Sequence, residues 1–321
     1  MAEPRWARRV VLGTAVAALA SLLPAGRAGA TQVTGVPVGR SPSSLAVNSL
    51  TGSVYVGCEG DGTVCVLDRA GVLRAVVPVG STVSGVAVNQ VTGRVYASNR
   101  RAGTVTVFEG ATGRVLSTIA AGPGAAALAV DETTDTVYVA SDASGAVTVL
   151  DGVAGSFANL VLGEAAALGG ICVDPGRRLA YCTSVDSARV EVLDLHTARF
   201  TGSIPVGRSP AGVALHRLSN TVYVANSGIH HLSVLDGSTR TETETILLGS
   251  AASAVAVHQG TATVYANGGA NGLVRIDGSR GERTGELPLG INPGAVAVDQ
   301  HTRVVYATDP VHDSVCVVRD F

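Results

Sequence analysis

Two short stretches of the sequence carry side chains that could bind a metal ion. His230 and His231 are adjacent, and Asp309, His312 and Asp313 lie within five residues of one another. Imidazole and carboxylate groups suit zinc, manganese and similar divalent ions. The two stretches are far apart in the chain, and neither contains a local metal-binding motif such as H-E-x-x-H. We therefore expect no cofactor, and a divalent metal held by these five residues is the alternative.

Four arginines could bind an anion. Arg40 and Arg208 occur in the same Gly-Arg-Ser-Pro motif, and Arg100 and Arg101 are adjacent. A guanidinium group can pair with a carboxylate or a phosphate through two parallel hydrogen bonds. The candidate ligand-binding residues are these four arginines together with Glu59, Asp61 and Asn226.

Other kinds of chemistry find little support in the composition. The sequence has no lysine, which excludes a Schiff-base lysine and the lysine of a phosphate-binding P-loop. No G-x-S-x-G nucleophile motif occurs. The formal net charge is −2, and the only tryptophan, Trp6, lies near the N-terminus. Neither a basic surface nor aromatic stacking faces therefore indicate nucleic-acid binding.

The five cysteines allow two interpretations. Cys58 and Cys65 flank a short polar turn and are the best candidates for a disulfide, which export would permit. Alternatively, all five are small buried hydrophobic residues with free thiols. A regular hairpin would place Cys172 opposite Tyr181. No C-x-x-C pair indicates a zinc or redox site.

The candidate metal-binding and anion-binding residues and the cysteines lie within a repeated sequence pattern, and each repeat contains one tyrosine. The tyrosines recur every 41 to 43 residues, at Tyr55, Tyr96, Tyr138, Tyr181, Tyr223, Tyr265 and Tyr306. Each repeat contains four short β-branched runs separated by Gly, Pro, Asn and Ser, which is typical of strands and hairpins. A strand-rich repeat near this period predicts an all-β fold, a single seven-bladed β-propeller with four antiparallel strands per blade.

The two ends of the chain indicate how the ring closes. We name the four strands of a repeat a to d in chain order. The stretch 32–39 resembles a strand d with no a, b or c before it, and 315–320 resembles a strand c with no d after it. The N-terminal strand should therefore complete the last blade. The runs are apolar almost throughout, so both faces of each blade are expected to be covered.

Within such a meander, the d–a and b–c loops share one face around the channel, and the a–b and c–d loops share the other. The candidate residues lie on or beside the d–a and b–c loops, where variation on a fixed scaffold commonly carries function. On the other face, the acids that end strand c are expected to bond their own turns. His216 and His258 replace the Asn or Asp that ends strand a elsewhere, and we interpret them as turn residues.

The repeats resemble the YVTN family of propeller repeats, found in surface-layer and exported bacterial proteins. The resemblance covers 32–321; Thr-Val-Tyr-Val-Ala-Asn at 221–226 and Thr-Val-Tyr-Val-Ala-Ser at 136–141 are close to the family core, and Ala-Tyr-Cys-Thr at 180–183 departs most. It implies a propeller scaffold with an extracytoplasmic binding or surface role, and it brings no catalytic residues.

The first 30 residues have the features of a signal peptide. Arg8 and Arg9 precede a short apolar run, and Ala-Gly-Ala at 28–30 fits a cleavage site. The twin arginine indicates the route that exports folded proteins. We expect a signal peptide at 1–30, the propeller at 31–321, and an extracellular, periplasmic or cell-wall location with no membrane span in the mature chain.

Two functions follow from these observations. The first is an exported, non-catalytic binding or surface-interaction propeller that uses the d–a and b–c loop face at the channel, with a small molecule or a protein or cell-surface partner. The alternative is a propeller enzyme, a lactonase-like or metal-assisted hydrolase or lyase with its site at the channel mouth. We expect a monomer and no nucleic-acid partner.

Overall fold

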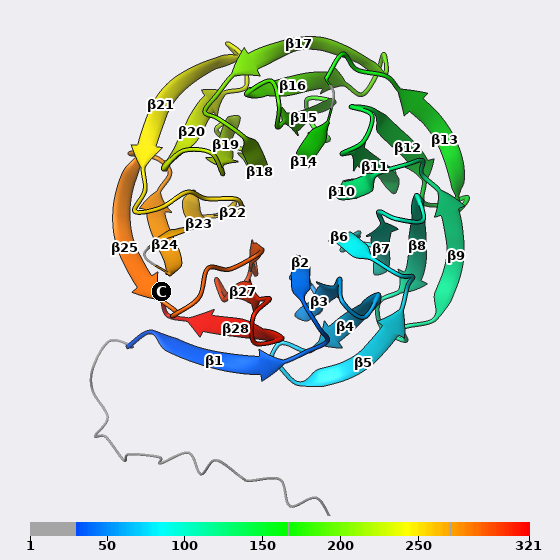
Figure 1. Ribbon diagram of the computed structural model, residues 1–321, viewed down its shortest axis with the longest axis horizontal. Helices are drawn as coiled ribbons and strands as arrows, with labels where there is room; N and C mark the ends of the chain where they lie inside the picture. Colours follow the sequence, from blue (N-terminus) through cyan, green and yellow to red (C-terminus); the bar gives the residue numbers. More distant parts are fainter. Residues whose placement is uncertain (1–29, 166, 270) are drawn as a thin grey trace, which may run out of the picture. The chain divides into compact units, whose positions relative to one another are not determined.

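The computed structural model describes residues 30–165, 167–269 and 271–321, and the regular elements within them are β-strands. They form seven four-stranded sheets, arranged as blades around a central opening (Figure 1). Six sheets contain four consecutive strands, and the seventh joins the two ends of the chain. The predicted all-β, seven-bladed propeller is confirmed.

The strand bounds follow the repeat. Blade 1 contains β2 (Pro42–Asn48), β3 (Ser53–Cys58), β4 (Thr63–Leu67) and β5 (Leu73–Pro78), and blade 2 contains β6 (Val83–Val88), β7 (Arg94–Asn99), β8 (Thr104–Glu109) and β9 (Val115–Ala120). Blade 3 contains β10 (Ala125–Asp131), β11 (Thr136–Ser141), β12 (Val147–Asp151) and β13 (Ser156–Val161), and blade 4 contains β14 (Leu168–Asp174), β15 (Leu179–Ser184), β16 (Arg189–Asp194) and β17 (Arg199–Pro205). Blade 5 contains β18 (Pro210–His216), β19 (Thr221–Asn226), β20 (His231–Asp236) and β21 (Thr241–Leu247), and blade 6 contains β22 (Val255–His258), β23 (Thr263–Gly269), β24 (Gly272–Asp277) and β25 (Glu282–Pro288). Blade 7 contains β26 (Val296–Val298), β27 (Val305–Asp309), β28 (Ser314–Arg319) and, from the start of the chain, β1 (Gln32–Pro37).

The second strand of each blade lies in the core. In blade 5, Tyr223 on β19 pairs with Ala214 on β18 and with Val234 on β20. Its ring packs with buried residues of the next blade, including Val257. The tyrosines are therefore packing residues between blades, as the apolar runs predicted.

The outermost strands differ from the expectation of two covered faces. The side chains of β13 are exposed except at its last residue, and those of β21 are exposed except at Ile246. The physical reason is position, because strand d forms the outer rim of the ring (Figure 1), where neighbouring blades contact each other far less than they do at their inner strands.

Ring closure occurs as predicted. β1 is antiparallel to β28, from Gln32 opposite Arg319 to Pro37 opposite Ser314. Figure 1 shows β1 as the outer strand of the blade that ends the chain. Pairing the two ends in this way leaves no open edge between them.

The five cysteines are free thiols. Cys58 and Cys65 are buried, and the Cys58 thiol donates to the Cys65 sulfur across 3.8 Å. Cys172 pairs with Tyr181, as the regular hairpin predicted.

The predicted signal peptide at 1–30 lies outside the described residues except for Ala30. In the described part of the chain, no helix is long and apolar enough to span a membrane.

Candidate functional site

Backbone hydrogen bonds sort the loops into two faces. The Val38 amide donates to the Asp313 carbonyl and joins a d–a loop to a b–c loop. The Gly152 amide donates to the Asp135 carbonyl and joins a c–d turn to an a–b turn. We call the first face the loop face and the second the turn face. The predicted sorting of the loops is confirmed, and the arginine candidates belong to the loop face.

Arg40 is engaged within the protein. Its Nε lies 2.6 Å from Asp61 Oδ1, its amide donates to Asp61 Oδ2 at 2.6 Å, and its Nη2 donates to the Gly60 carbonyl at 3.0 Å. The Arg40 amide and guanidinium hold the pKa of Asp61 below its ordinary value, and the bond to Asp61 raises the pKa of Arg40. These contacts anchor the segment after the closing strand onto blade 1.

Arg208 has the same backbone setting without the carboxylate. The Gly60 amide donates to the Arg40 carbonyl, and the Gly228 amide donates to the Arg208 carbonyl in the same way. Ile229 occupies the place in its loop that Asp61 occupies in blade 1. Arg208 is exposed, and within the described residues its side chain forms no ion pair.

Arg100 and Arg101 line a groove on the loop face between blades 2 and 3. The groove has a volume of about 510 Å³ and is lined by Thr82, Arg100, Arg101, Gly124, Asp142 and Ala143. Arg100 Nε lies 2.5 Å from Asp142 Oδ2. Arg101 is exposed and, among the residues described, pairs with no carboxylate. The groove therefore offers one neutralised and one uncompensated guanidinium group.

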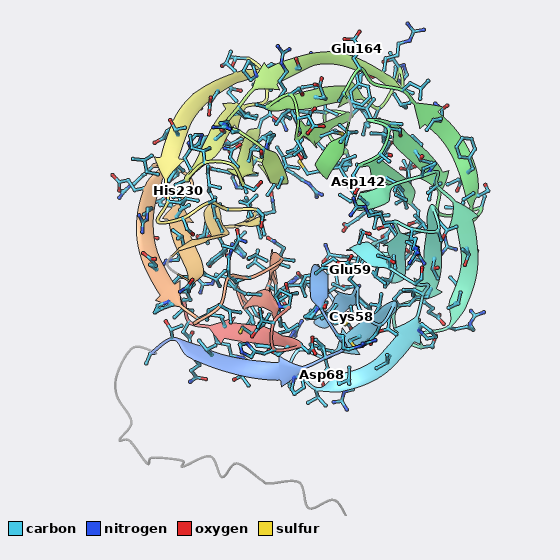
Figure 2. All side chains as sticks on the ribbon, viewed as in Figure 1. Cys58, Glu59, Asp68, Asp142, Glu164 and His230 are labelled. Atoms are coloured by element: carbon cyan, nitrogen blue, oxygen red, sulfur yellow. The ribbon has the colours of Figure 1, made fainter. Side chains whose placement is uncertain are left out.

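The other two ligand candidates have different settings. Glu59 is exposed, and Figure 2 shows it and Asp142 beside the central opening. Asn226 is fully buried, and its amide donates to the His231 carbonyl at 3.2 Å and to Ser233 Oγ at 3.0 Å. Asn226 thus holds the hairpin from within, while Glu59 faces solvent.

The structure brings together only part of the predicted metal set. His312 Nδ1 lies 2.7 Å from Asp309 Oδ2, and Asp309 Oδ1 accepts the amide of His312 at 3.0 Å. Asp313 accepts the Ser41 amide at 2.8 Å. The histidines at 230 and 231 belong to blade 5, two blades away from this group. Within the described ranges, no three His, Cys, Asp or Glu side chains converge as a metal site would require, and the metal site stays a prediction.

The channel itself is neutral, which sequence reasoning did not anticipate. Its volume is about 340 Å³, and its wall is the innermost strand region of every blade. The lining is small and uncharged, for example Ser84, Gly169, Ala211 and Ala295. The sequence does indicate this small, uncharged lining, because each repeat has Gly, Ala or Ser just before the first apolar run.

Polar groups on the turn face bond one another, as expected. His216 Nδ1 lies 2.7 Å from Ser219 Oγ within its own turn, and its Nε2 lies 3.0 Å from the Gln259 carbonyl of the next blade. His258 repeats the pattern with Thr261 and Gln300. The interpretation of both histidines as turn residues is confirmed.

Comparison with known proteins supports the fold alone. No family model matches the chain, and no curated protein matches it. Among solved structures, it is similar to Kuenenia stuttgartiensis hydrazine synthase, with a TM-score of 0.75 and 14% identity over 87% of this chain and 96% of that chain. It is also similar to U3-55K, with a TM-score of 0.77 and 13% identity over 89% of this chain and 98% of that chain. At these identities, the similarity identifies the chain as a seven-bladed β-propeller.

Proposed function

We propose that the protein is an exported, non-catalytic binding propeller of the YVTN type that holds an anionic partner on its loop face. The observation that carries this proposal is Arg101, an uncompensated guanidinium group in the groove between blades 2 and 3. Arg208 is a second exposed arginine on the same face. Two such groups separated by a neutral channel suit an extended partner with several carboxylates, such as an acidic protein segment.

The contrast between the two faces supports the choice of site. Asp236 and Asp277 on the turn face accept amide hydrogens of their own turns, at 2.7 Å from Ser238 and 2.9 Å from Ser279. These bonds fix the turns through Oδ1 of each carboxylate. On the loop face, the loops differ from blade to blade, so a ligand can be selected there without changing the scaffold.

A double variant tests the proposal. Replacing Arg101 and Arg208 with Gln should weaken binding of an oligoglutamate peptide about three- to tenfold, because each exposed charge contact contributes less than about 1 kcal/mol. Calorimetric titration at two salt concentrations should also show a smaller salt dependence. Arg280→Gln is the matched control, since Arg280 is exposed on the turn face. Equal loss in the control, or none in the double variant, would reject this site.

Export is part of the same proposal and has its own test. The secreted protein should begin at Thr31, and its mass should lack residues 1–30. Replacing Arg8 and Arg9 with Ala should abolish secretion if the twin-arginine route is used. An intact Met1 in the secreted form would contradict cleavage, and unchanged secretion of the double variant would contradict the route.

A further inference from the structure

The core tyrosines reach across to the next blade, and at four interfaces glycine makes room for them. A Cβ added to Gly152 would lie 2.3 Å from the Tyr96 hydroxyl, and one added to Gly278 would lie 2.5 Å from the Tyr223 hydroxyl. Gly110 and Gly237 receive Tyr55 and Tyr181 in the same way. Real side chains do not tolerate such distances, so the tyrosine hydroxyl fits against these four turns because the residue there is glycine.

Three blades have a larger residue at this position. Leu195 occupies it in blade 4, facing Tyr138, and Asp320 occupies it in blade 7, facing Tyr265. A cleft lies at each of these two interfaces, of about 400 Å³ beside Tyr138 and about 490 Å³ beside Tyr265. Both clefts therefore occur where a larger residue replaces the glycine. Its side chain occupies the space that the tyrosine hydroxyl fills at the other interfaces.

The third replacement is Arg69 in blade 1, which faces Tyr306. Arg69 Nη2 donates to the Ser49 carbonyl at 3.2 Å, and its Nε lies 3.9 Å from a carboxylate oxygen of the buried Asp299. Tyr306 is fully buried at this interface. The long side chain therefore bridges the two blades, in contrast to the Tyr138 and Tyr265 interfaces, where a cleft lies beside the tyrosine.

The Tyr138 cleft has an apolar lining with acidic groups. Leu150, Leu193 and Leu195 are buried side chains that line it. Asp151 and Asp194 also line it and are half-buried. The lining therefore combines apolar and polar side chains, and a volume of this size is typical of small-molecule sites.

The charges in this cleft favour a cation. Arg178 lines it too, but its Nη1 lies 3.0 Å from a carboxylate oxygen of the fully buried Asp131, which compensates its charge. The Thr197 amide and hydroxyl hold the pKa of Asp194 below its ordinary value, so this carboxylate stays ionised at neutral pH. Together with Asp151, it gives the cleft an uncompensated negative charge.

Besides the negative charge of the cleft, the Tyr138 hydroxyl is an independent indication of a ligand. Its side chain is 4% exposed and lines the cleft, and none of the described residues forms a hydrogen bond with its hydroxyl. Tyr96, by contrast, donates to Asp135. The hydroxyls of Tyr181 and Tyr306 also lack a partner among the described residues, but both side chains are fully buried and line neither cleft. The Tyr138 hydroxyl, unlike these two, is open to the cleft, where a bound molecule can supply its hydrogen-bond partner.

We propose that the cleft between blades 3 and 4 binds a small aryl-alkyl amine. The aryl group would pack on Val153, Ala158 and Ala198, which line the cleft and are at least partly exposed. The ammonium group would bond to Asp151 and Asp194, with the Tyr138 oxygen as a further acceptor. This site lies on the turn face and is independent of the anion site on the loop face.

The Tyr265 cleft is an internal comparison with different chemistry. Arg275, Arg303, Asp277 and Asp320 all line it, so its opposite charges offset one another. Arg275 also stacks over Phe321, with its guanidinium carbon 5.3 Å from the ring centroid. This cleft therefore lacks the net negative charge that would attract an amine.

The first test uses the unmodified chain 31–321 and two probes with the same ring and opposite charge. Calorimetric titration with 2-phenylethylammonium should show saturable binding at millimolar concentration or below, and 3-phenylpropionate should show none. Equal binding of the two probes, or no binding of the amine, would overturn the proposal whatever the variants do.

The second test locates the binding. Asp151→Asn together with Asp194→Asn keeps the oxygens that accept the turn amides and removes the negative charge. The double variant should bind the amine with roughly five- to tenfold lower affinity. Tyr138→Phe should lower the affinity for the amine about threefold, while the matched variant Tyr265→Phe should leave that affinity unchanged. Unchanged amine affinity in both cleft variants, or an equal loss in Tyr265→Phe, would place the amine elsewhere and overturn the assignment.

Discussion

Deleting Gln32–Val38 should destabilise the whole propeller by at least about 3 kcal/mol, because it removes a complete strand from the blade that closes the ring. Every residue of β1 pairs with β28, so the deletion exposes the backbone groups of β28. Most β1 side chains are exposed, and Val36 and Val38 pack against the buried cluster formed with blade 1. The loss should therefore come mainly from main-chain pairing and from the reopened ring.

Urea or thermal unfolding of the chain 31–321 measures this effect. The control is a chain that starts at Gln32, because it loses only Thr31 and the bond from the Thr31 hydroxyl to the Asp320 carbonyl. The control should change the free energy of unfolding by less than about 0.5 kcal/mol. If the deletion variant melts at the temperature of the parent chain, the closing strand does not stabilise the ring.

Replacing Arg94 with Gln should lower the free energy of unfolding by about 2–3 kcal/mol. Arg94 on blade 2 donates from Nη1 to Asp135 Oδ2 at 2.7 Å and to the Gly152 carbonyl at 2.7 Å, both on blade 3. Asp135 is 3% exposed and also accepts from Tyr96 and Asn89. Without Arg94, the buried carboxylate would keep neutral donors but lose its counter-charge.

Denaturant unfolding of the two proteins provides the measurement. Arg114→Gln is the control, because Arg114 is exposed and its Nε lies 3.8 Å from the partly exposed Glu109. The control should change stability by less than about 0.5 kcal/mol. If both variants lost the same free energy of unfolding, burial of the Asp135 carboxylate would not make its ion pair with Arg94 more stabilising than an exposed pair.

The sequence determined the architecture because the relevant signals are local and repeated. Tyrosine every 41 to 43 residues, with apolar runs on both sides, is enough to set strand order and blade number. The incomplete first and last repeats also determined ring closure. Turn chemistry was local as well, since His216 bonds Ser219 only three residues away.

Exposure of the outer strands was misjudged for a physical reason. A nearly continuous apolar run normally means two covered faces. In this ring, neighbouring blades contact each other mainly through their inner strands, so the outermost strand β13 stays exposed, with Phe157 and Leu160 on its surface. The run of residues alone does not reveal how far a strand lies from the centre.

Only the tertiary structure decided which charges are already neutralised. Arg40 and Arg208 are equivalent in the repeat, but Asp61 neutralises the first and Ile229 stands in its place beside the second. Arg100 pairs with Asp142 because neighbouring blades bring residues 42 positions apart to within 2.5 Å. The Tyr138 cleft likewise depends on Leu195 of the next blade. Repeat periodicity specifies each strand locally, whereas ion pairs and clefts form between blades, where the identity of the facing residue decides the outcome.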